Sequence, residues 1–183
     1  MEESLEQKSI FQMAIPSGVL LGIIHAIVYL ALYFFLPSKI KGFSYLFFVI
    51  VLNFGYTIFK AIEYRKSIGG YLEFGGVFQL TLFTLAISGL IGSLLVPVAL
   101  SLALPDYAEV VATSQMDTSI YWASKFGAPE ESLDQMRQEM DIEKLKEQYS
   151  TARVALGYLF ASIFYAITAV IVGFIARKSQ PIE

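Results

Sequence analysis

Charged residues are missing from four long stretches of the chain, and this pattern dominates the sequence. The stretches are 9–38, 42–59, 74–105 and 154–176, with 30, 18, 32 and 23 residues. A helix needs about 20 apolar residues to cross a bilayer, and the short connections after the first two stretches make neighbouring helices antiparallel. The pattern therefore predicts an all-α integral membrane protein, with four antiparallel transmembrane helices in a single membrane domain over residues 1–183. We expect the spans at about 14–36, 43–62, 74–97 and 152–176.

A polar segment, residues 105–151, separates the third and fourth predicted spans. Between Pro105 and Arg153 there are ten Asp or Glu residues and five Lys or Arg residues. Pro129 followed by Glu130 and Glu131 suits the start of a helix, because carboxylates complement the helix dipole at that end. We therefore expect a helical insert outside the membrane between the third and fourth spans.

The distribution of Lys and Arg suggests an orientation in the membrane. These residues are denser, and closer to the span ends, on the side that would hold both termini. Because positive residues near span ends favour the cytoplasmic side, we expect both termini in the cytoplasm and the insert on the opposite side. The acidic start of the chain disfavours a cleavable signal peptide, so the first stretch is interpreted as an uncleaved span.

Composition narrows the possible chemistry. Hydrophobic residues make up 56% of the chain and charged residues 16%, whereas a typical soluble domain has about 25% charged residues. With no cysteine and one histidine, the chain cannot build disulfides, thiolate sites or a metal site of several histidines. A net charge of −3 without a dense basic run gives no electrostatic basis for nucleic-acid binding. The sequence thus assigns no catalytic residue, no metal site and no cofactor.

Polar residues inside the predicted spans form the candidate site. In the first span, small and polar residues recur every three or four positions and so share one helix face; they are Gly18, Gly22, His25, Tyr29 and Tyr33. In the second span a comparable stripe consists of Tyr45, Val49, Asn53, Tyr56 and Lys60. If the span centres align, one polar layer lies near the middle of the membrane, with the members His25, Asn53, Ser88 and Tyr165.

Two interpretations of this polar layer compete. In the structural one, neutral His25 and Asn53 join helices by hydrogen bonds that contribute about 1 kcal/mol each, with Asn53 as the best partner of His25 and Tyr165 as the alternative. In the functional one, a titratable group at this depth marks a path for protons or a ligand, or a contact with a cofactor held by a partner. The spans contain no Asp or Glu, which favours the structural interpretation.

Two further sets of residues have expected roles. Small residues on helix faces allow close packing, and we assign this role to Gly18, Gly22, Gly89 and Gly157. Basic residues at the end of the second span could hold anionic lipid headgroups; these are Lys60, Arg65 and Lys66. Alternatively, Lys60 pairs with Glu63 across one helical turn.

Residues 64–78, with the sequence YRKSIGGYLEFGGVF, carry a resemblance to a known family. The Tyr-Arg pair, the Gly-Gly pair and the Phe-Gly pair shortly before the third span resemble the signature of DUF4199-type domains, a small multi-pass family of unknown function common in Bacteroidota. A polar helix before the last span, 131–148, adds to the resemblance, while the insert at 107–127 departs from it. The resemblance implies a four-helix protein of the bacterial inner membrane. With the orientation expected from the Lys and Arg distribution, the insert 105–151 would lie in the periplasm. It implies no activity and no catalytic residue.

The expected function is that of a non-enzymatic multi-pass membrane protein. The leading hypothesis is a scaffold or accessory subunit that packs with lipid, with other membrane-protein subunits or with further copies of itself. The alternative is a small oligomeric transporter or channel that uses the polar layer around His25. An intramembrane enzyme is the weakest hypothesis, because the spans offer neither paired carboxylates nor a Ser–His pair with a supporting acid.

Overall fold

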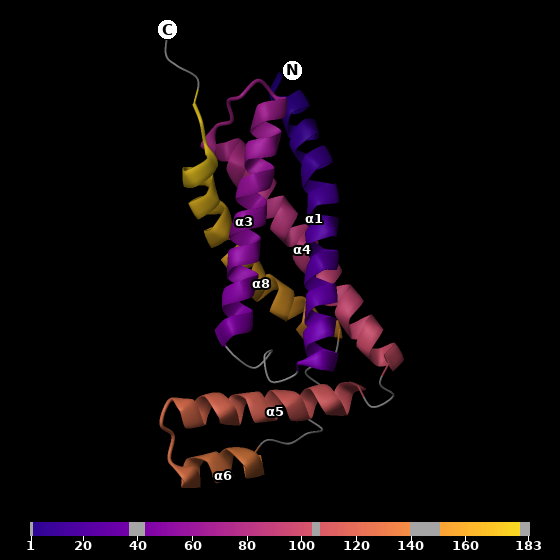
Figure 1. Cartoon of the computed structure of the whole chain (residues 1–183), viewed down its shortest axis with the longest axis vertical. Helices are drawn as coiled ribbons and strands as arrows, with labels where there is room; N and C mark the ends of the chain where they lie inside the picture. The colour runs from indigo at the N-terminus through magenta and orange to yellow at the C-terminus, as the bar shows by residue number, and fades with distance from the viewer. Residues whose placement is uncertain (1, 37–42, 104–106, 140–150, 180–183) are drawn as a thin grey trace. The chain divides into compact units, whose positions relative to one another are not determined.

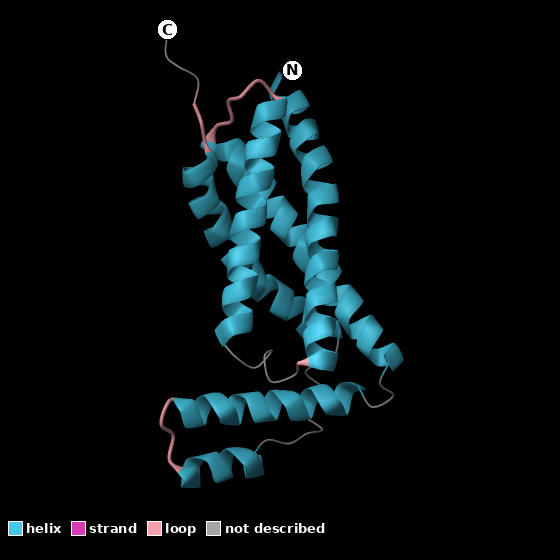
Figure 2. Cartoon of the chain, in the orientation of Figure 1, coloured by secondary structure: helices cyan, strands magenta, loops and turns pink. Residues whose placement is uncertain are grey.

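The computed structural model describes residues 2–36, 43–103, 107–139 and 151–179, and its regular structure is helical (Figures 1 and 2). The described residues form the helices α1 (Glu2–Phe35), α3 (Phe43–Ser67), α4 (Phe74–Ala103), α5 (Tyr107–Lys125), α6 (Glu130–Glu139) and α8 (Thr151–Ala176). Extended pairing in these ranges is limited to one isolated antiparallel bridge between Leu72 and Lys178. The all-α prediction is confirmed.

Three helices are long and apolar enough to cross a membrane. Their apolar segments are Ile10–Phe35, Tyr45–Ser67 and Phe74–Leu100. These segments overlap the first three expected spans. The first begins at Ile10 instead of residue 14, the second ends at Ser67 instead of residue 62, and the third ends at Leu100 instead of residue 97, because α4 continues through Pro97. In α8 the apolar part is the shorter segment Phe160–Ala176, so the fourth span stays a prediction.

Contacts divide the chain into two compact units. One consists of residues 1–96 together with 158–183, and the other of residues 97–157. In the second unit α5 and α6 pack against each other and bury Leu133. Gly127 makes the turn between them with a φ of 84°, a left-handed conformation that glycine adopts at little cost. The segment expected as an insert is therefore helical in its described part, while residues 140–150 lie outside the described residues.

In the first unit the helices run in alternating directions (Figure 1). Tyr29 near the end of α1 lies beside Tyr45 near the start of α3, with ring centroids 6.0 Å apart, so these two helices are antiparallel. The rings of Phe11 in α1 and Phe83 in α4 are tilted by 36° with centroids 4.4 Å apart. Further along both helices, Gly22 of α1 lies against Ile91 of α4, so this pair is parallel. Each terminus of the unit, the start of α1 and the end of α8, lies at the same end of the helices.

Glycines bring α1 and α4 into close contact. A Cβ atom added at Gly18 would lie 2.7 Å from Ile87 Cβ and 2.7 Å from the Thr84 carbonyl oxygen. One added at Gly22 would lie 2.7 Å from Ile91 Cβ and 2.8 Å from the Ser88 carbonyl oxygen. Only glycine fits at this separation, because real Cβ atoms do not approach backbone so closely. The two helices are therefore held at short range along two turns.

The end of this unit that holds the α3–α4 connection is densely packed. A cluster of buried side chains fills it, made up of Ile10, Ala14, Ala61, Tyr64, Leu72, Val77, Leu80, Val172 and Ala176. The backbone of Leu72 donates to the Lys178 carbonyl at 3.0 Å and accepts from its N–H at 2.9 Å. The Arg65 guanidinium donates to the Ala176 carbonyl at 2.8 Å, which satisfies one of the open carbonyls at the end of α8. We call this arrangement of Arg65, Leu72, Ala176 and Lys178 the clasp.

Candidate ligand-binding cavity

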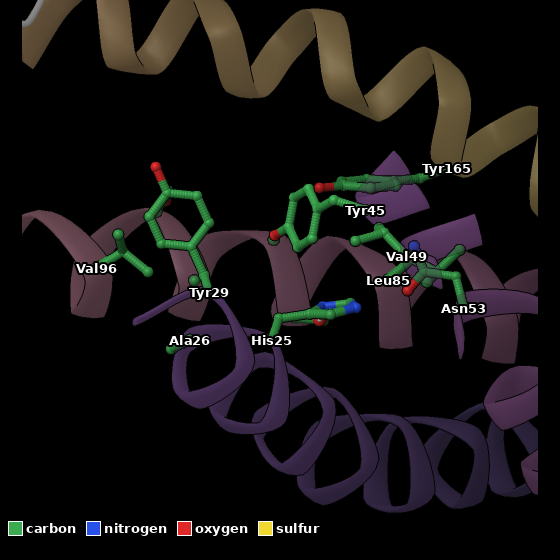
Figure 3. Close-up of a pocket in the computed structure, with 13 residues that line it drawn as sticks. His25, Ala26, Tyr29, Tyr45, Val49, Asn53, Leu85, Val96 and Tyr165 are labelled. Atoms are coloured by element: carbon green, nitrogen blue, oxygen red, sulfur yellow. The ribbon is translucent and has the colours of Figure 1, made fainter. Parts of the chain in front are cut away.

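A cavity of about 240 Å³ lies between α1, α3, α4 and α8 in the first unit (Figure 3). The side chains that face it share a lack of formal charge and mix hydroxyl, amide, imidazole and aliphatic groups. The lining residues are His25, Ala26, Tyr29, Tyr45, Val49, Asn53, Leu85, Ser88, Gly89, Gly92, Ser93, Val96 and Tyr165. The four residues of the predicted polar layer, His25, Asn53, Ser88 and Tyr165, thus line one cavity.

The imidazole of His25 is held by Ser88. Nδ1 of His25 lies 3.2 Å from Oγ of Ser88, a hydrogen bond that joins α1 to α4. The expected partner was Asn53 on α3, and the structure corrects this. Gly22 lies one helical turn before His25 and touches the Ser88 carbonyl, so α4 is the nearest helix to this face of α1. The close approach at the glycine therefore selects Ser88 over Asn53.

Two polar atoms of the lining are buried without a hydrogen-bond partner among the described residues. They are Nε2 of His25 and Oδ1 of Asn53. Figure 3 shows the imidazole of His25 extending to the side of the cavity on which Asn53 lies. A buried polar atom without a partner costs about 1–3 kcal/mol. Both atoms have essentially no exposed surface, so the surrounding protein covers them and the space of the cavity does not reach them.

Three tyrosines form the aromatic wall of the cavity. Tyr29 and Tyr45 meet edge to face at 6.0 Å, and the Tyr165 ring comes from α8 and lines the same cavity (Figure 3). Each of these side chains is half-buried, whereas Leu85 and Ser88, which line the cavity from α4, are buried. Tyr165 packs directly over Gly89, where an added Cβ would lie 2.9 Å from its Cζ. The small residue at 89 therefore sets the position of this ring.

Comparison with known proteins gives a family for this fold and cavity. The sequence profile described as "Protein of unknown function (DUF4199)" matches residues 16–178. This chain belongs to the DUF4199 family. Neither the curated proteins nor the solved structures contain a match to it. The match includes every residue that lines the cavity.

The segment that carries the family resemblance builds the clasp in this DUF4199 protein. Gly69 and Gly70 have φ values of 98° and 91°, which other residues rarely adopt, and they lead from α3 to Leu72. Arg65 and Leu72 then bind the end of α8. The signature is therefore explained by the joining of two helix ends, at a distance along the helices from the cavity.

The basic residues at the end of α3 are only partly available to lipid. Lys60 pairs with Glu63 at 2.7 Å, as one of the two expectations had it, and Arg65 is engaged with the Ala176 carbonyl. Lys66 is exposed. A headgroup role for all three residues stays a prediction, with Lys66 the most accessible of them.

The expected packing glycines have three different surroundings. Gly18 and Gly22 lie against α4, and Gly89 lies under Tyr165. Gly157 belongs to α8, but its contacts lie outside what the structure describes.

Among the described residues no group of three or more metal-ligating side chains comes together.

Sequence reasoning missed part of the cavity. Tyr29, Tyr45 and Val49 stood on the predicted stripes without being assigned to the polar layer, and Gly92 was not singled out. Their spacing contains the signal: Tyr29 follows His25 by four residues, and Gly92 follows Ser88 by four. Residues one turn away from a polar residue face the same space, so the stripes extend the layer toward one end of the helices.

Proposed function

We propose that this DUF4199 protein is a non-enzymatic membrane protein that spans the bilayer four times and binds a small neutral molecule in the cavity. The observation that carries the proposal is the convergence of His25, Asn53, Ser88 and Tyr165, from four different helices, on one cavity of about 240 Å³ without charged residues in its lining. A concave, mostly apolar space with a few converging polar groups is typical of a small-molecule site.

The fourth span of the proposal is α8. Its 26 residues correspond to about 39 Å of helix, which exceeds the roughly 30 Å of a hydrocarbon core. Large apolar side chains project from it, among them Phe160, Phe164 and Phe174, with exposed fractions of 68%, 70% and 59%. Such a face suits lipid. Residues 105–151 would then lie in the periplasm of a bacterial inner membrane, with both termini in the cytoplasm.

The orientation is tested with reporter fusions. A reporter after Glu183 should be active in the cytoplasm, and one inserted near Gly127 should be active in the periplasm. Gly127 lies in an exposed turn, so an insertion there disturbs little packing. The reverse pattern would overturn the proposed orientation.

Binding is tested by filling the cavity. A Cβ atom added at Gly92 meets nothing within 4 Å, although this residue lines the cavity, so a side chain can begin there without a clash and Gly92→Leu adds bulk to the lining. Gly55→Leu is the matched control, because Gly55 is also free of neighbours within 4 Å and lies outside the lining.

Native mass spectrometry of protein released from lipid nanodiscs is the measurement. We expect wild type and Gly55→Leu to retain a small molecule that Gly92→Leu lacks. The same adduct in equal amounts on wild type and Gly92→Leu, or no adduct on wild type, would contradict the proposal.

A scaffold or accessory subunit is the second candidate, favoured by an aromatic patch on the second unit. Phe126 is 81% exposed and Tyr121 42% exposed, with Trp122 packed between them at centroid distances of 6.0 and 5.4 Å. Aromatic residues of this kind are enriched at interfaces. Replacing Tyr121 and Phe126 with Ser should release a co-purifying membrane protein if this role is correct, while retention of every partner would count against it.

A further inference from the structure

The last turn of α8 joins an apolar outer face to two basic residues. Phe174 and Ile175 are both 59% exposed, and Ile171, one turn earlier, is 42% exposed. Arg177 and Lys178 follow directly after the end of the helix and are exposed as well. With α8 as the fourth span of the proposed function, the apolar side chains face lipid chains and the basic side chains lie at the level of the headgroups.

Both basic groups are held next to aromatic rings. Cζ of Arg177 lies 5.3 Å from the centre of the Phe174 ring, and Nζ of Lys178 lies 5.3 Å from the centre of the Tyr71 ring. A cation over an aromatic face is attracted by the ring. The clasp fixes the backbone beneath the two side chains, because Leu72 and Lys178 exchange two hydrogen bonds. The basic groups are therefore positioned without a ligand.

Nearby acidic residues do not neutralise these two groups. Glu73 accepts a hydrogen bond from the Ser179 hydroxyl at 3.0 Å, and Glu63 is paired with Lys60 at 2.7 Å. The side chains of Arg177 and Lys178 form no hydrogen bond or ion pair with another described residue. Their N–H donors and their charges are thus available to an anion that lies outside the protein.

From these features, and resting on the proposed fourth span, we infer that the end of α8 binds an anionic glycerophospholipid. The phosphate accepts hydrogen bonds from the Arg177 guanidinium, whose paired N–H groups match two phosphate oxygens, and Lys178 adds a second positive charge. The acyl chains lie along the apolar face at Phe174 and Ile171. A zwitterionic lipid brings a positive group of its own, so the site should prefer the anionic lipid.

This site differs from the basic residues of α3, two of which are engaged within the protein. Lys60 is paired with Glu63, and Arg65 donates to a backbone carbonyl of α8. In the proposed orientation the end of α8 lies on the cytoplasmic side, where anionic lipids give the membrane surface a negative potential.

Native mass spectrometry measures the preference. The full chain is placed in nanodiscs with equal amounts of phosphatidylglycerol and phosphatidylcholine, and the lipids that it retains on release are identified by mass. We expect wild type to retain phosphatidylglycerol in preference to phosphatidylcholine. Arg177→Gln and Lys178→Gln should each reduce the ratio about fivefold, the effect of one basic residue near an anionic surface. Lys178 contributes only its backbone to the clasp, so its substitution leaves those hydrogen bonds in place.

Lys66→Gln is the matched control, because Lys66 is an exposed basic residue at the same end of the unit and its replacement removes the same charge. Its lipid ratio should stay close to that of wild type. Equal reductions in all three variants would show attraction by the total charge and overturn the site. Equal retention of the two lipids by wild type would also overturn it.

Wild-type protein tests the site without any variant. A molecule that binds only the folded state raises the thermal unfolding midpoint. Phosphatidylglycerol added in neutral detergent should therefore raise the midpoint more than phosphatidylcholine does. Equal shifts with the two lipids would overturn the proposal.

The outcomes separate this site from the proposed function. Reporters at Gly127 and Glu183 on opposite sides of the membrane, with equal retention of the two lipids, would retain the fourth span and overturn the lipid site. Reporters on the same side would overturn the fourth span itself. Gly92→Leu should retain phosphatidylglycerol as wild type does, and its loss in that variant would place the lipid in the cavity instead.

Discussion

The two halves of the helical unit 1–96 and 158–183 are built from the same helices but packed in opposite ways. In the buried cluster at the end that holds the clasp, side chains such as Leu72, Val77 and Val172 are at most 2% exposed and fill the space between the helices. Around His25 the same helices leave a cavity of about 240 Å³. The close contacts at Gly18 and Gly22 lie just before that cavity along α1. The cavity is thus bordered by tight packing, which is typical of a formed site rather than of a loosely packed protein.

Gly22→Leu should cause the largest loss among substitutions that test this contrast. The added side chain would meet Ile91 and the Ser88 carbonyl, and α4 would have to move away from α1. Overpacking of this kind costs about 3 kcal/mol, and it would also displace the hydrogen-bond partner of His25. Thermal unfolding in detergent measures the loss, with Gly55→Leu as control. An unchanged midpoint would show that the two helices are not in contact there.

Arg65→Met should have the next largest effect, at the clasp. It keeps most of the aliphatic side chain but removes the donor to the Ala176 carbonyl. A hydrogen bond from a charged group contributes about 2 kcal/mol. Lys66→Met is the control, since Lys66 is an exposed neighbour. Proteolysis near residue 176 should become faster in Arg65→Met alone, and equal rates in the two variants would contradict the capping role.

His25 is a more moderate test, at the cavity. His25→Leu removes the group that bonds Ser88, but the serine hydroxyl can turn to a carbonyl of its own helix, as Ser93 does to Leu90. We expect a cost of about 1 kcal/mol in the free energy of unfolding. His25→Gln should lose less, because an amide can replace one ring hydrogen bond. A greater loss of stability in His25→Gln than in His25→Leu would show that the hydrogen bond to Ser88 does not stabilise the fold.

Lys60→Gln should change stability least. The Lys60–Glu63 pair joins residues three apart on one helix, with the Glu63 side chain 48% exposed, and such pairs contribute below about 0.5 kcal/mol. Unfolding midpoints at low and high salt should differ little from those of wild type. A loss comparable to that of Arg65→Met would give Lys60 a role beyond this pair.

Much of this architecture was predictable from local pattern. Charge-free stretches located the long helices, and three- and four-residue spacing placed His25, Tyr29 and Gly22 on one face, because both signals depend on residues close in sequence. The partner of His25 was not predictable in the same way. It depends on how α1, α3 and α4 are rotated about their axes, which the contacts at Gly18 and Gly22 decide.

The contacts of the clasp could not be predicted from the sequence, for a related reason. The sequence of residues 64–78 suggested a turn, but its partner lies after α8, and Arg65 and Ala176 are 111 residues apart. Nothing in the local pattern of either segment identifies the other. The volume of the cavity also depends on the positions of many side chains. The polar layer could be inferred from the expected depth of its residues in the membrane, but the cavity that these residues line could not.

The late position of Lys178 in the sequence has a consequence for biosynthesis. A ribosome that has just produced Leu72 must add α4, α5, α6 and α8 before Lys178 emerges, which takes on the order of ten seconds at ordinary elongation rates. Until then the backbone groups of Leu72 that will face Lys178 have no partner from that residue. The clasp therefore closes only when α8 is complete, and messages truncated within α8 should yield protein that quality-control proteases remove.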